Sequence, residues 1–301
     1  MARRTAPGVG PTLDVRGTHF VLGKGGSGKS LVAEGLALLA ARDGERVLLV
    51  RLGESASVDR ESAAMTLRHG FEVIDLDARD AMDDYVRRVV RIRPLAARII
   101  ASDVYRRFFA AAPGLPELVL LGRIRAYAEE AGRRGESRWS VVIVDCPSSG
   151  HGVLMLETPS VALRAVTAGP FSRVASGVAG WLKEATSASI VAVPEEMAVV
   201  EAIELGDELR ERVGLRPRFV FLNRMRGETL SVEARRVIAS AASAGDELLA
   251  ESARRAAKRS RLEGFHRRRL AKGLGVSPIG LVDMGDADPE SMEATIREAT
   301  S

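Results

Sequence analysis

The sequence predicts an α/β fold in which a mostly parallel sheet is flanked by helices and interrupted by a helical insertion. Two observations carry this prediction. The runs 47–50 (VLLV) and 141–144 (VVIV) are continuously apolar and lie beside charged residues, as is typical of parallel strands buried on both faces. Segments with apolar residues at helical spacing alternate with such runs along most of the chain.

The first part of the chain begins with a short apolar strand, His19–Leu22, that ends at a cluster of glycines. Leucines at helical spacing follow and predict a helix that stops at Gly44. The next two strands are expected at Val47–Val50 and Phe71–Leu76.

Between 78 and 132 the apolar spacing is helical throughout, and Pro94 and the turn 113–116 divide it into three predicted helices. This stretch is too long for an ordinary crossover between strands, so we expect a helical insertion there. A shorter helical segment is expected at about 157–186.

The alternation continues after the strand at 141–144. The expected elements are helices near Ser160–Ala168 and Ser172–Thr186, a strand at Ser189–Val193, a helix at Glu195–Arg212, a strand at Arg218–Leu222, a long helical region at Ser231–Lys272, a strand at Pro278–Val282 and a helix at Pro289–Ala299.

Composition is that of a globular protein, with 301 residues, 46% hydrophobic residues and a net charge of +4. We expect a flexible tail at 1–16, which lacks the apolar core of a signal peptide, and one domain at 17–301. No apolar run approaches the length of a membrane span. The single cysteine, Cys146, excludes an internal disulfide and fits a reducing cytoplasm.

Residues 23–30 (GKGGSGKS) match G-x-x-x-x-G-K-[ST], the pattern of a P-loop between a strand and a helix. We expect the backbone of Gly25, Gly26, Ser27, Gly28 and Lys29 to surround a β-phosphate at the positive end of the next helix. The Lys29 side chain would bridge the β- and γ-phosphates, Ser30 would ligate Mg²⁺, and Leu31 would complete the contacts. The predicted ligands are therefore ATP or ADP with Mg²⁺. A glycine-rich turn with two lysines by chance is the alternative, and the flanking strand and helix disfavour it.

Two of the five lysines in the chain, Lys24 and Lys29, lie in this loop. Lys24 is not part of the general pattern, and its position resembles that of the lysine in the deviant Walker A class of P-loop proteins. That resemblance implies a dimer in which Lys24 reaches the partner's nucleotide and acts catalytically with Lys29. A merely electropositive loop is the alternative.

Asp145 ends the strand 141–144 and opens the segment DCPSSGH, or D-x-P-x-x-G-H. A carboxylate at this place can hold Mg²⁺, usually through water. The segment resembles switch II of the arsenite-pump and tail-anchored-protein-targeting ATPase family, also described as anion-transporting ATPase-like, with one residue fewer before the proline. The stretch 194–197 (PEEM) is similar to a segment of the same family, and Asn223 is similar to its adenine-reading asparagine. An asparagine amide supplies both a donor and an acceptor to a base edge.

The resemblance covers about residues 19–226 and implies a dimeric switch in which ATP joins two subunits face to face. Closure of the dimer would move the helical insertions and carry the output to a protein or lipid client. A homodimer and a heterodimer with a paralogous ATPase both fit this expectation.

The chain departs from the family at switch I, where the family has an aspartate that orients the attacking water. The matching stretch is 51–57 (RLGESAS), with Gly53 at or next to the aspartate position. Glu54 is the nearest carboxylate and is our candidate for the catalytic role, with Asp59 further along. Because positioning dominates phosphoryl transfer, we expect hydrolysis by this chain to be slow or absent while binding is intact.

Two other features bear on partners. The paired cysteines of the zinc-bridged family members are missing, so no zinc is expected, and Cys146 is interpreted as a core residue. The apolar positions of 82–130 are interpreted mainly as the insertion's own core, with an apolar client groove as the alternative.

The C-terminal region carries many arginines and lysines between 254 and 272. We interpret them chiefly as a solvated helix face, with contact to an anionic membrane or nucleic acid as the alternative. Nucleic acid is not favoured, and any membrane contact is expected to be peripheral.

Two further classes of function stay open at this point. The runner-up to the dimeric switch is an ATPase of the partition or septum-positioning type, which acts on membrane or DNA. A structural adaptor that binds no nucleotide would require the whole P-loop to be vestigial.

Overall fold

The computed structural model describes residues 13–301 except 53–65, 69, 131–136, 149, 166–167, 227–235, 237–239, 241–246, 284 and 286–287. Its centre is an eight-stranded sheet in the order β3-β4-β2-β5-β1-β6-β7-β8. Seven strands run parallel and β3 pairs antiparallel with β4, which confirms the predicted mostly parallel sheet. The strands are β1 (Gly17–Gly23), β2 (Val47–Leu52), β3 (Thr66–Arg68), β4 (Phe71–Leu76), β5 (Val141–Asp145), β6 (Thr186–Ala192), β7 (Pro217–Met225) and β8 (Ile279–Val282).

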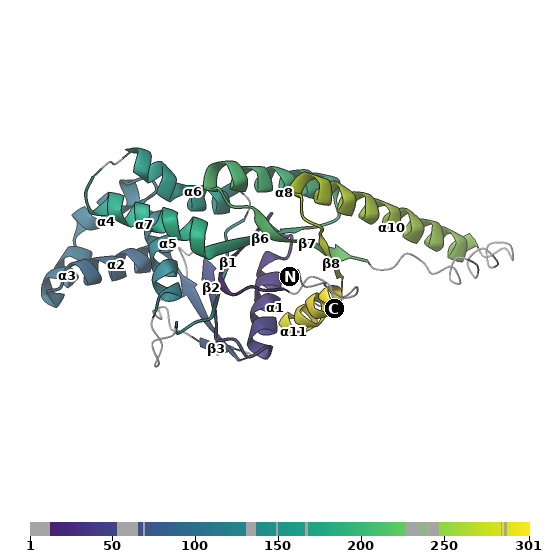
Figure 1. Cartoon of the computed structure of the whole chain (residues 1–301), viewed down its shortest axis with the longest axis horizontal. Coiled ribbons are helices and arrows are strands. Elements are labelled where there is room, and N and C mark those ends of the chain that lie inside the picture. The colour runs from purple at the N-terminus through teal and green to yellow at the C-terminus, as the bar shows by residue number, and fades with distance from the viewer. Residues whose placement is uncertain are drawn as a thin grey trace, which may run out of the picture.

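Helices cover both faces of the sheet (Figure 1). One face is covered by α1 (Lys29–Arg42) and α11 (Pro289–Thr300), and the other chiefly by α5 (Leu115–Ala128), α6 (Gly150–Ala165), α7 (Pro170–Ala185) and α8 (Glu196–Glu208). Alternate residues of each central strand enter different cores: Phe20 and Leu22 pack with the α5–α8 side, whereas Val21 packs with α1. Burial on both faces explains why these strands read as continuous apolar runs.

Four helices lie between β4 and β5, where the sequence predicts three. They are α2 (Ala78–Val89), α3 (Arg93–Ile100), α4 (Asp103–Ala111) and α5. The additional break falls at Ser102, whose hydroxyl accepts a hydrogen bond from the Tyr105 amide and donates one to the Ile99 carbonyl. Pro94 lies in the first turn of α3, where a proline costs no hydrogen bond. Met82, Val86, Leu121 and other apolar residues of these helices are buried, but in the same core as Phe20 and Leu48 of the sheet rather than in a core of their own.

Three predicted boundaries are wrong, and the first is the start of β6, which lies at Thr186 rather than at Ser189. Helix α6 begins at Gly150 rather than near Ser160, although it contains Gly152 and Pro159. A Cβ at Gly152 would lie 2.7 Å from Leu22 Cδ2, so the glycine allows α6 to pack closely on β1. The third boundary is the end of β7, which continues past Leu222 to Met225.

The C-terminal region adds α10 (Glu247–Leu274), which packs along α8 and projects beyond the sheet (Figure 1). A single π-helical turn at Leu209–Val213 follows α8. No helix among the described residues is both long enough and apolar enough to span a bilayer.

Candidate functional site

The predicted P-loop lies at the carboxyl end of β1, in the middle of the sheet. Parallel pairing with β5 places Val21 opposite Asp145, and the Cys146 amide donates to the Val21 carbonyl at 3.2 Å. Because neighbouring parallel strands end at the same edge, the P-loop and Asp145 meet there, at the crevice where open α/β sheets bind ligands.

Hydrogen bonds within the P-loop hold it in a tight turn. The Ser27 amide and hydroxyl both donate to the Lys24 carbonyl, at 3.2 and 2.8 Å. Helix α1 then starts after Gly28 without any side-chain cap, and its first turn carries no acidic residue. The unpaired N–H groups at the start of α1 are therefore available to an anion, as the sequence predicts for this loop.

Gly28 is needed for conformational and steric reasons. Its φ of 87° lies in the left-handed region. A Cβ there would lie 2.3 Å from Nδ2 of Asn223, a contact that no ordinary packing tolerates. The Asn223 amide donates to the Ser27 carbonyl at 2.9 Å, so β7 and the P-loop are fastened together at this point.

Asp145 lies largely buried beside the P-loop. Burial raises the pKa of its carboxyl, and a hydrogen bond from Ser30 and the charges of Lys29 and Arg51 only partly oppose this. Its Oδ1 is buried and has no hydrogen-bond partner in the described part of the molecule. A buried carboxylate oxygen without a partner, next to a serine hydroxyl, fits a hard divalent cation such as Mg²⁺. Ser30 and Asp145 are thus brought together as expected for a metal pair.

We predict that Asp145→Asn raises the stability of the ligand-free protein while it removes the effect of Mg²⁺ on nucleotide binding. The folded state raises the carboxyl pKa above its unfolded value, so the ionised group destabilises the fold at pH values above the folded pKa. Relief of that burial should raise the free energy of unfolding at neutral pH, and the gain should disappear as the pH falls through the folded pKa toward the unfolded value. Chemical denaturation at neutral and acidic pH measures this. Equal or lower stability of Asp145→Asn at neutral pH would contradict it.

Lys24 forms an ion pair within its own chain. Its Nζ lies 2.6 Å from Oε1 of Glu201, which belongs to α8. Both side chains are about one-third to one-half exposed, so another charged group can reach Lys24 and replace Glu201 as its partner. Lys24 is therefore held to one side of the loop in a single subunit, and no sequence pattern identifies Glu201 as its partner.

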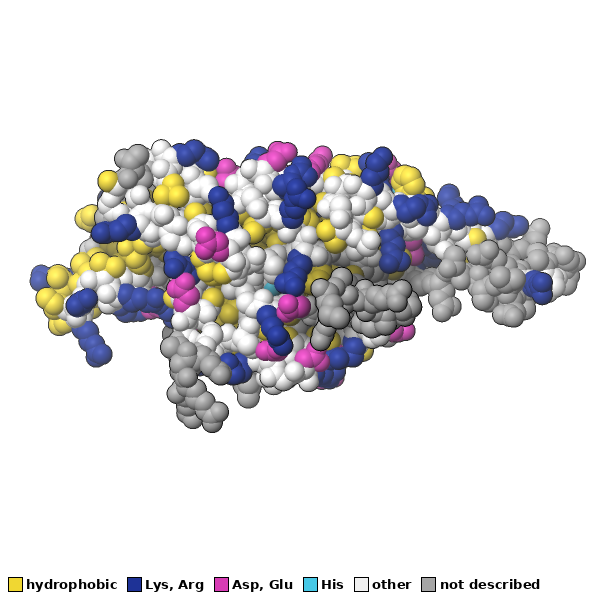
Figure 2. All heavy atoms as spheres, viewed as in Figure 1, with side chains coloured by type: hydrophobic (Ala, Val, Ile, Leu, Met, Phe, Trp, Pro, Cys, Tyr) yellow, Lys and Arg dark blue, Asp and Glu magenta, His cyan; other side chains and the backbone are white. Residues whose placement is uncertain are grey.

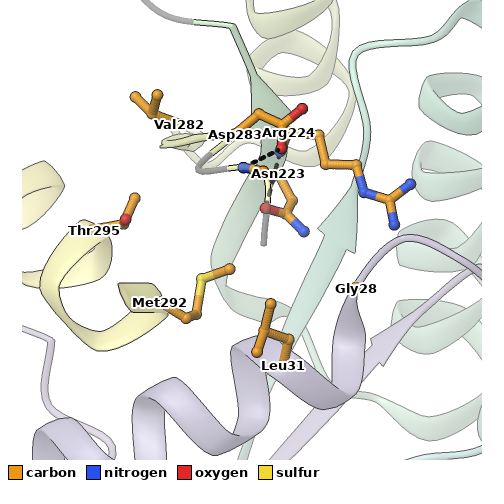
Figure 3. Close-up of a pocket in the computed structure, with 9 residues that line it drawn as sticks. Gly28, Leu31, Asn223, Arg224, Val282, Asp283, Met292 and Thr295 are labelled. Carbon is orange, nitrogen blue, oxygen red and sulfur yellow. Dashed lines mark hydrogen bonds between the residues drawn. The ribbon is translucent and has the colours of Figure 1, made fainter. Parts of the chain in front are cut away.

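A pocket of about 240 Å³ opens beside the P-loop. It lies where β7 and β8 end and where α11 meets α1 (Figure 3). The side chains of Leu31 and Met292 lie close together on one side of it, and Asn223 lies on another side. The residues that line it are Gly28, Leu31, Asn223, Arg224, Val282, Asp283, Gly285, Met292 and Thr295. The lining combines the apolar side chains of Leu31, Val282 and Met292 with the four polar side chains of this set.

The side-chain amide of Asn223 uses only part of its hydrogen-bonding capacity. Its Oδ1 accepts from the Arg224 amide at 2.9 Å and its Nδ2 donates to Ser27, which leaves one N–H and one lone pair. Arg224 has a φ of 59°, the one positive value among the described non-glycine residues. This unusual backbone turns β7 at the rim of the pocket.

The switch I candidates Gly53, Glu54 and Asp59 lie outside the described residues. The strand that leads to them, β2, ends at Leu52. Its Arg51 forms a two-point ion pair with Asp75 at 2.7 and 2.8 Å. In switch II, Gly150 and His151 form the start of α6, and His151 is exposed. Cys146 is buried in the core, as expected, and burial raises the pKa of its thiol.

Sequence reasoning missed the contribution of α11 to the pocket. The glycine at position 35, in the middle of α1, could have indicated this contact. A Cβ there would lie 2.6 Å from Met292 Cγ. The glycine lets α11 approach α1, and Arg42 of α1 pairs with the buried Glu293 of α11. A glycine inside a predicted helix indicates a close helix contact, but not which helix makes it.

Comparison of the sequence with known proteins identifies a family and several relatives. The family model described as anion-transporting ATPase matches residues 18–172. The chain is 28% identical over 212 residues to a putative ATPase of Mycobacterium bovis and to ATPase BagA of Mycobacterium tuberculosis. The matched segment covers 64% of this chain and 61% of each of those relatives.

Proposed function

The chain belongs to the anion-transporting ATPase family, and from that premise we propose that it is a switch protein that binds Mg-ATP and acts as a dimer. Nucleotide binding is coupled in this proposal to a conformational change and to the handling of a client. ATPase homologues at 28% identity support the ATPase class.

One observation carries the proposal: three features of a nucleotide site converge at one edge of the sheet. The uncapped start of α1 offers backbone N–H groups to phosphates, and Lys29 lies in the same turn. Asp145 and Ser30 lie beside it. The pocket between Leu31, Asn223 and Met292 lies directly beyond Gly28, at the right place for a base whose phosphates occupy the loop.

Each group has a defined role in the proposal. The amides of Gly25–Lys29 hold the β-phosphate, Lys29 neutralises charge on the β- and γ-phosphates, and Asn223 offers its remaining donor and acceptor to adenine. Ser30 and Asp145 would hold Mg²⁺, which neutralises phosphate charge and orients the γ-phosphate when it is bound. The buried position of Asp145 strengthens its interaction with a cation, because the local dielectric is low.

The degenerate switch I motif supports a finer proposal about hydrolysis. Gly53 stands where an aspartate is expected, so we propose that this chain binds ATP but hydrolyses it poorly, and that it pairs with an active paralogue. Nucleotide binding and ATP turnover should be measured in parallel on the purified chain. Tight binding with little turnover is expected. Robust turnover that is lost in Lys29→Ala would overturn the impaired-subunit proposal and leave the binding site intact.

The ion pair between Lys24 and Glu201 gives a test of the dimer. We propose that Lys24 leaves Glu201 when it reaches the nucleotide of a second subunit. An exposed pair of this kind contributes up to about 1 kcal/mol, so Glu201→Gln should lower the ATP concentration for half-maximal dimerisation two- to five-fold. Lys24→Ala should abolish dimerisation with Mg-ATP. Light scattering against ATP concentration measures both.

Glu204→Gln is the matched control, because Glu204 is exposed on the same helix and forms no ion pair with a described residue. This variant should need the same ATP concentration for half-maximal dimerisation as the unchanged chain. The trans role of Lys24 is wrong if Lys24→Ala dimerises normally, and its restraint by Glu201 is wrong if Glu201→Gln and Glu204→Gln behave alike. If the natural dimer is heteromeric, the same titration is made with the paralogue.

A further inference from the structure

The exposed face of α10 carries a regular stripe of cations. Arg254, Lys258, Arg261, Phe265, Arg268 and Lys272 follow one another at alternating spacings of four and three residues, and all six are exposed. Since an α-helix has 3.6 residues per turn, they lie on one side of α10, over a length of about 27 Å. We call this set the α10 stripe.

The stripe has almost no compensating negative charge. Between 254 and 272 there are nine lysines and arginines and a single acidic residue, Glu263. Glu263 is buried and accepts a hydrogen bond from the Arg226 amide, so it faces away from the stripe. The five stripe cations have no ion-pair partner among the described residues. In Figure 2, Lys and Arg side chains gather at the end of the molecule where α10 projects.

The packing of α10 on α8 fixes the direction of the stripe. A Cβ on Gly206 of α8 would lie 2.2 Å from Leu274 Cδ2, and a Cβ on Gly273 would lie 2.7 Å from Ile203 Cδ1 of α8. His266 and Leu270 are buried on the same inner side. These contacts hold the opposite side of the helix, including the stripe, outward.

Two apolar side chains lie among the cations. Phe265 is 51% exposed and Leu262 beside it is 46% exposed. Helices that lie in a bilayer interface combine Lys and Arg with Phe and Leu, because the cations meet lipid phosphates while the apolar groups enter the acyl boundary. Leucine has no favourable partner on a nucleic acid backbone, and the stripe contains no amide side chain to read bases.

We propose that the α10 stripe is a peripheral docking surface for an anionic lipid bilayer. Its cations contact lipid phosphates, and Phe265 and Leu262 insert shallowly between headgroups. The projecting position of α10 leaves the nucleotide site free while the stripe is occupied (Figure 1).

Co-sedimentation of the full chain with vesicles tests this proposal. Vesicles of phosphatidylcholine with about one-third phosphatidylglycerol are compared with pure phosphatidylcholine at about 0.1 M salt. Each cation near an anionic surface changes partitioning about five-fold, so the combined change Lys258→Gln, Arg261→Gln and Arg268→Gln should reduce binding to the anionic vesicles roughly 100-fold. Phe265→Ser keeps the charge and should still weaken binding several-fold.

The matched control removes three exposed cations elsewhere, with Arg173→Gln, Lys183→Gln and Arg216→Gln. It has the same net charge as the stripe variant and should bind nearly as the unchanged chain does. Equal losses in the two variants, or equal binding to neutral and anionic vesicles, would overturn the proposal. So would tighter binding to duplex DNA than to anionic vesicles at the same salt, with Phe265→Ser unaffected. Nucleotide binding should be unchanged in every variant, so failure here is separable from failure of the proposed switch.

Discussion

Replacement of Lys29 by alanine is expected to remove nucleotide binding while the fold survives. Lys29 lies at the start of α1, and it forms no ion pair with a described side chain. In the ligand-free protein its loss removes only the attraction between its charge and the buried Asp145 carboxyl. In the complex, loss of one partner from a desolvated charge pair typically costs 2–5 kcal/mol, so affinity for Mg-ADP should fall about 30-fold or more.

Thermal unfolding with and without Mg-ADP measures this effect. Saturating ligand should raise the melting temperature of the unchanged chain, since a ligand that binds only the folded state stabilises it. At the same ligand concentration Lys29→Ala should show little or no rise. Lys183→Ala, an exposed lysine on α7, is the control and should keep the full rise. A full rise in Lys29→Ala would show that the ligand binds elsewhere.

Gly28→Ala is expected to damage the site through the contact with Asn223. The left-handed backbone at φ 87° costs an alanine about 1–2 kcal/mol. The Cβ would also lie 2.3 Å from Asn223 Nδ2, and such overpacking typically costs another 1–3 kcal/mol. The bond from Asn223 to Ser27 should break, so nucleotide affinity should fall together with stability.

Two variants isolate the steric contribution. Gly26→Ala has nearly the same φ, 80°, but its Cβ would meet nothing within 4 Å, so its stability loss should stay near 1–2 kcal/mol. Asn223→Ala in the Gly28→Ala background removes the blocked group and should recover part of the lost stability. Denaturation of the four-member cycle gives the coupling energy. Additive losses would mean that Gly28 and Asn223 are not in contact.

The parts of the site that follow from the sequence are those fixed by local structure. The P-loop spacing fixes Lys29 and Ser30 at the start of α1, and the apolar run before Asp145 marks a parallel strand that ends at the same edge. Both predictions depend only on the sequence of one strand and of the residues that directly follow it.

The remaining parts depend on contacts between distant segments. Met292 and Thr295 reach the pocket because α11 packs on α1 at Gly35, more than 250 residues earlier in the chain. Nothing in the sequence near Lys24 identifies Glu201, since the pair spans 177 residues. The start of α6 could not be predicted for another reason. Glycine and proline have low helix propensity, but tight packing on β1 at Gly152 outweighs this low propensity.

Calorimetric titration of the chain with Mg-ADP and with Mg-pyrophosphate tests the proposed nucleotide site. The P-loop should bind both ligands, but only ADP fills the pocket between Leu31, Asn223 and Met292. We expect one Mg-ADP to bind per chain, at least about ten-fold more tightly than Mg-pyrophosphate. Binding of ADP should be weaker when Mg²⁺ is removed. Equal affinities for the two ligands would show that the pocket does not receive the base, and an absence of binding would contradict the nucleotide site itself.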